Sequence, residues 1–152
     1  MGVPAGRMVD RFGARRMIAA GLLAMLVGCG ALAALPAAYG VIAYIAPLTV
    51  ITAGYAVFQA ANNTAVMTSI QAQQRGVVSG LLNLSRNLGL ITGASVMGAV
   101  FALASGASNV AAAPREAVAS GMRVTFAVAA ALVVVALAVA IGARALAMRS
   151  SR

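Results

Sequence analysis

The stretch VTFAVAAALVVVALAVAIGA, residues 124–143, decides the fold class. It is uncharged throughout, and a helix needs about twenty apolar residues to cross a hydrocarbon core of about 30 Å. The whole chain shares this character: 62% of its 152 residues are hydrophobic, 9% are charged, and the mean hydropathy is +0.98. A globule of this size cannot bury so much apolar surface, and aliphatic residues without tryptophan favour packed helices in lipid. We therefore expect an all-α integral membrane protein whose surroundings are the lipid bilayer.

Three further apolar runs precede this span, and short segments rich in turn-forming residues separate them. The four transmembrane helices are expected at about residues 17–35, 39–70, 76–104 and 122–144, within a membrane unit that covers residues 17–148. Residues 1–16 are expected to form a cytoplasmic loop and residues 149–152 a cytoplasmic tail. The second run is interrupted by Pro47 and becomes polar in its second half.

The arginines predict the orientation of these helices. Eight of them fall on the side of the two termini and the middle loop, whereas Arg115 and Arg123 fall on the other side. The eight are Arg7, Arg11, Arg15, Arg16, Arg75, Arg144, Arg149 and Arg152. Because cytoplasmic loops carry the basic excess, both termini are expected in the cytoplasm. The arginines form no single basic face, so nucleic-acid binding is not expected.

Composition also suggests where this membrane lies. The chain is rich in alanine, glycine and arginine and has no lysine, which is typical of a GC-rich bacterial genome. We therefore expect a bacterial cytoplasmic (inner) membrane.

Polar residues recur on one face of each of the two middle helices, at spacings of three and four. They are Thr52, Tyr55, Gln59, Asn62 and Asn63 in the second helix, and Ser79, Asn83, Arg86 and Asn87 in the third. Amides inside a bilayer need partners or water, which predicts a hydrated cavity or a buried interface between these helices. The alternative is that the amides only bond one helix to the other.

Arg86 is the only charge well inside an expected span, and it stays protonated. Its side chain either pairs with an acid on another helix or with an anionic substrate group, or it snorkels to the cytoplasmic surface. Snorkelling is an alternative because Arg86 lies only about 16 Å along the helix from Arg75. No carboxylate lies within a span, because Asp10 is at the cytoplasmic edge and Glu116 is expected in an external loop. A proton carrier would therefore have to lie outside this chain.

Glycines on the third helix predict close helix packing. Gly76 and Gly80, then Gly89 and Gly93, form two GxxxG pairs, which let helix backbones approach. We expect this helix to lie in the middle of a packed bundle. The first and fourth helices are apolar all round, so they are expected to be lipid-facing supports.

The N-terminal segment AGRMVDRFGARR, residues 5–16, resembles the loop signature GxLaDRxGRR of the major facilitator superfamily of secondary transporters. Gly6, Asp10, Arg11 and Gly13 match it, and Arg15 fills a basic slot beside Arg16, while Ala14 stands where an arginine is usual. Residues 54–102 are similar to the penultimate helix pair of the fourteen-helix drug:proton antiporter branch.

This resemblance implies part of a major-facilitator-type helix bundle, formed by the last four helices of an efflux antiporter. The partners it implies are the missing N-terminal helices, a small-molecule substrate and protons, and the fragment is not expected to be active alone. Asp10 would hold the cytoplasmic side closed by bonding the N-terminus of a neighbouring helix, or it only neutralises nearby arginines.

Two other classes of protein are alternatives to a transporter fragment. A small standalone four-helix membrane protein, oligomeric or structural, would have the same composition. The segment LVGC, residues 26–29, resembles the end of a lipoprotein signal, because it ends on the single cysteine, Cys29. The apolar run continues beyond this cysteine, however. With no histidine and no nucleophile beside a base, the chain is not expected to be an enzyme, to bind a metal or to hold a cofactor.

Overall fold

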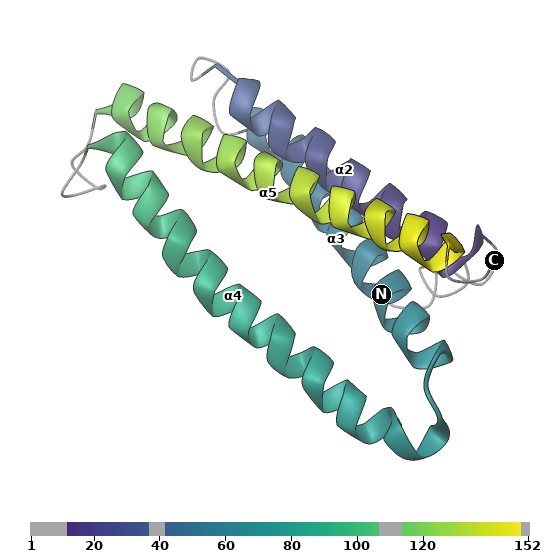
Figure 1. Cartoon of the computed structure of the whole chain (residues 1–152). Helices are drawn as coiled ribbons and strands as arrows, with labels where there is room; N and C mark the ends of the chain where they lie inside the picture. The colour runs from purple at the N-terminus through teal and green to yellow at the C-terminus, as the bar shows by residue number, and fades with distance from the viewer. Residues whose placement is uncertain (1–11, 37–41, 107–113, 150–152) are drawn as a thin grey trace.

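The computed structural model describes residues 12–36, 42–106 and 114–149 and places most of them in long helices (Figure 1). These are α2 (Ala14–Ala34), α3 (Ile42–Thr68), α4 (Arg75–Ser105) and α5 (Arg115–Arg149), and a short 3-10 helix, η2 (Ala72–Gln74), joins α3 to α4. The described residues form no strand. By length and composition, four helical segments could each cross a membrane. The expected all-α membrane fold is confirmed.

Two details differ from the sequence-based expectation. Pro47 does not interrupt the second helix, because α3 continues through it as one element. Glu116 was expected in a loop, but it lies in the first turn of α5. An acid is favourable there, since the exposed N–H groups of a helix N-terminus carry partial positive charge.

The helix α2 is central to the arrangement. It packs against both α3 and α5, whereas α4 packs mainly against α5. In Figure 1, α3 and α4 meet at η2 and run apart from there, and α4 meets α5 at its other end. Apolar side chains of α2 such as Leu23 and Val27 nevertheless stay exposed, so the expected role of the first helix as a lipid-facing support stays a prediction.

Glycines explain why α2 and α3 pack so closely. A Cβ atom on Gly21 would lie 2.7 Å from both the Gly54 carbonyl oxygen and the Phe58 backbone nitrogen. One on Gly28 would lie 2.9 Å from the Pro47 carbonyl oxygen. Only the absence of a side chain lets the two backbones touch at these points, which is the usual basis of tight helix packing in membranes.

Two glycines with positive φ mark helix ends. Gly13 precedes α2 with φ of 82°, and its carbonyl oxygen accepts hydrogen bonds from the backbone nitrogens of Arg16 and Met17 at 3.2 and 3.3 Å. Gly106 ends α4 with φ of 60°, and its N–H donates to the Ala102 carbonyl oxygen at 3.1 Å. Residues with a Cβ rarely adopt this backbone conformation, so glycine is favoured at both ends.

Candidate functional site

A cleft of about 410 Å³ lies between α3 and α4. The α3 residues that line it are Tyr55, Phe58, Gln59, Asn62 and Asn63, and the α4 residues are Leu82, Ser85, Arg86, Gly89 and Leu90. Another side of α3 carries Gly54 and Ala61, which are buried. The helical period thus gives α3 a packed side and a polar side that borders the cleft.

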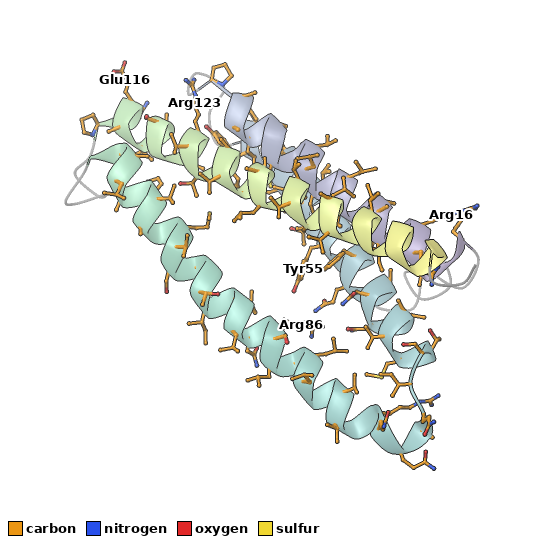
Figure 2. All side chains as sticks on the ribbon, viewed as in Figure 1. Arg16, Tyr55, Arg86, Glu116 and Arg123 are labelled. Atoms are coloured by element: carbon orange, nitrogen blue, oxygen red, sulfur yellow. The ribbon has the colours of Figure 1, made fainter. Side chains whose placement is uncertain are left out.

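The chain topology brings the polar centres of the two helices to the same level. Gln59 lies about 14 Å before the end of α3 and Arg86 about 17 Å after the start of α4, at 1.5 Å per residue. Because η2 joins those two helix ends, the two side chains meet across the cleft. Figure 2 shows the side chains of Tyr55 and Arg86 in the space between α3 and α4.

Arg86 donates hydrogen bonds to Gln59 across this cleft. The amide oxygen faces the guanidinium, because a guanidinium and an amide NH2 group are both donors and cannot bond to each other. Arg86 Nε, Nη2 and Nη1 lie 2.7, 2.8 and 3.1 Å from that oxygen. The Tyr55 hydroxyl oxygen lies 3.5 Å from the same end of the amide. This geometry favours a cross-cleft role for Arg86 over snorkelling.

The groups around Arg86 are neutral. Besides the Gln59 amide oxygen, it donates through Nη1 to Asn83 Oδ1 at 3.5 Å. Among the residues that the structure describes, Glu116 is the one carboxylate, and it lies in the first turn of α5. The end of α4 that meets α5 is about 28 Å of helix away from Arg86. The cleft therefore presents a permanent positive charge that no described acid neutralises.

The polar residues of the two stripes do not all face the cleft. Gln59, Asn62, Asn63 and Arg86 line it, whereas Asn83 and Asn87 are exposed and do not. Thr52 is exposed, and its hydroxyl donates to the Leu48 carbonyl oxygen of its own helix at 2.8 Å.

Some lining residues were not among the predicted site residues. Leu82 and Ser85 share the Arg86 side of α4 with Gly89, which was predicted only for helix packing. Their spacings of three, four and seven are typical of one helix face and could have identified Leu82 and Ser85. The polar pattern of the sequence indicated the neighbouring asparagines instead.

The loop signature is only partly described. Gly6, Asp10 and Arg11 lie outside the described residues, so their predicted gating role stays a prediction. Gly13 has the positive φ given above. Arg15 and Arg16 border a second hollow of about 500 Å³ between the start of α2 and the end of α3, together with Thr68 and Ser69.

No described residue packs against the four glycines predicted to pack α4. A Cβ atom on Gly76, Gly80, Gly89 or Gly93 would meet none of the described atoms of other elements within 4 Å. Close packing among the described residues occurs instead at Gly21, Gly28, Gly54 and Gly121. Packing through the α4 glycines stays a prediction.

Comparison with known proteins gives matches of two kinds. The family profile described as Major Facilitator Superfamily matches residues 1–149. A curated protein of Escherichia coli (strain K12), described as an uncharacterized transporter, YebQ, is 36% identical over 93 residues, which are 61% of this chain and 20% of that protein. The chain therefore spans a small part of the length of this relative. No solved structure matches the chain.

Proposed function

The chain belongs to the major facilitator superfamily, and from this premise we propose that it forms the last four membrane helices of a secondary active transporter. The proposed transporter is a multidrug or small-molecule exporter of the fourteen-helix branch, which exchanges its substrate for protons in a bacterial cytoplasmic membrane. The chain alone is not expected to transport, because alternating access requires two helix bundles that move around a shared site.

The polar cleft between α3 and α4 is the observation that supports this proposal. Its walls come from two apolar helices long enough to cross a membrane, yet it contains a guanidinium and three amides. The position of Gln59 and Arg86, about 14–17 Å from the helix ends at η2, corresponds to about half of a 30 Å hydrocarbon core. Transporters of this kind bind substrates near the membrane midplane. The volume of the cleft falls within the roughly 300–1,000 Å³ typical of ligand pockets.

Proton coupling would need residues beyond the described ones. Arg86 does not release its proton at physiological pH, and Glu116 lies at the start of α5, away from the cleft. We propose that the coupling acid is on another helix of the transporter. Asp10 would act at the cytoplasmic surface, where its carboxylate bonds a helix N-terminus in the state closed on that side.

Dye efflux tests this function. The transporter that contains this chain is expressed in an Escherichia coli strain without its main exporters, and accumulation of a cationic dye, ethidium, and of an anionic dye, fluorescein, is measured with and without a protonophore. We expect lower accumulation of at least one dye in expressing cells, and loss of the difference when the protonophore collapses the proton gradient. The 152-residue chain alone serves as the control and is expected to leave accumulation unchanged. Export by that short chain would contradict the proposal and favour a standalone four-helix protein.

A further inference from the structure

We propose that the cleft between α3 and α4 binds the carboxylate of an amphipathic organic anion, with Arg86 as the charged contact. This inference rests on the proposed function, because it names the chemical class of the substrate. It concerns only the residues that line the cleft and the geometry around Arg86.

The first argument is charge. A guanidinium in a low-dielectric environment is costly unless an opposite charge balances it. Among the described residues, the hydrogen-bond partners of Arg86 are Gln59 and Asn83, which carry no charge. An anion that enters the cleft therefore gains an electrostatic attraction that a neutral or cationic molecule does not.

The second argument is the geometry of the Gln59 amide. Its oxygen lies 2.7, 2.8 and 3.1 Å from Arg86 Nε, Nη2 and Nη1, and three such similar distances place it over the face of the guanidinium. A carboxylate binds instead in the guanidinium plane, through two parallel hydrogen bonds to the edge formed by Nε and Nη2. Among the described residues no acceptor is hydrogen-bonded in that plane to this edge, so it is available to a ligand carboxylate.

The third argument is the rest of the lining. Phe58, Leu82 and Leu90 provide apolar surface, and Tyr55 provides an aromatic ring with a hydroxyl group near Arg86. An apolar body packed against these side chains is removed from water, while the amides of Asn62 and Asn63 remain available for further polar groups. The lining therefore fits a molecule that has an aromatic or aliphatic body and one acidic end.

Binding of 2-naphthoate tests the inference, with 2-naphthamide as its neutral counterpart of similar shape. The 152-residue chain is reconstituted into phosphatidylcholine nanodiscs, and binding of each probe is measured by equilibrium dialysis against empty nanodiscs. We expect saturable binding of the carboxylate, about 10- to 100-fold tighter than that of the amide, as for a hydrogen-bonded charge pair. Arg86→Gln should abolish this preference. Arg86→Lys should retain part of it, because the charge remains without the planar fork.

The matched control is Arg123→Gln, which removes an exposed arginine on α5, outside the cleft, and should leave the preference unchanged. Circular dichroism checks that each variant keeps its helix content. Absence of saturable naphthoate binding to the wild-type chain would overturn the inference, and so would a preference that survives Arg86→Gln. Neither result depends on dye export, so the inference and the proposed function fail separately.

Discussion

The close contact between α2 and α3 gives a direct prediction for Gly21→Ala. The new Cβ atom would lie 2.7 Å from two backbone atoms and 2.9 Å from the Phe58 Cβ atom. Since carbon atoms pack at about 3.5–4.0 Å, the contact with the Phe58 Cβ atom would require the two helices to separate by about 0.6 Å or more. A gap of that size forfeits about a quarter to a half of the dispersion energy of each contact. Neither backbone can yield locally, because both belong to continuous helices.

Overpacking of this kind typically costs about 1–3 kcal/mol. The matched control is Gly30→Ala on the same helix, where a Cβ atom meets nothing within 4 Å. Alanine raises helix propensity by about 1 kcal/mol at either position, so the comparison cancels that gain. The assay is unfolding in mixed micelles of dodecyl maltoside and increasing sodium dodecyl sulfate, followed by circular dichroism. We expect Gly21→Ala to be less stable than Gly30→Ala by about 1–3 kcal/mol. Equal stability of the two variants would refute the packing argument.

Two further predictions concern the start of α2 and the orientation of the helices. Gly13→Ala should lower the free energy of unfolding by about 1–2 kcal/mol in the same assay, because alanine is strained at φ of 82°. The control is Gly76→Ala, because a Cβ atom at Gly76 would meet no described atom within 4 Å and Gly76 has no positive φ. An equal change in the free energy of unfolding for both variants would contradict the explanation. In cells that carry the Cys29→Ser chain, a membrane-impermeant maleimide should label Ser108→Cys directly and Ser151→Cys only after permeabilisation, because both termini are predicted to be cytoplasmic. The reverse labelling pattern would show the opposite orientation.

Part of the cleft lining was predictable from the sequence, and there is a physical reason why the rest was not. Spacing along α3 predicted that Tyr55, Gln59 and Asn62 share a face, because that depends only on the helical period. On α4 the same argument placed Asn83 and Asn87 beside Arg86, but the cleft selects a narrower strip of the helix. Which strip faces α3 depends on how α4 is rotated after η2, and no local pattern specifies that rotation.

The amino-acid sequence by itself determined that the chain forms long apolar helices with enough length to cross a membrane. Crossing a bilayer is a property of each segment alone, since every helix satisfies its own backbone hydrogen bonds and needs only enough apolar length. The tertiary structure decided which helices touch. It placed α2 in contact with both α3 and α5, and no described residue packs against the α4 glycines. Small residues permit close packing wherever they occur, but contact also requires that a second helix presents a matching face at the same level. The pairing of Gln59 with Arg86 across the cleft has the same origin, because it depends on two helices that η2 joins in one particular register.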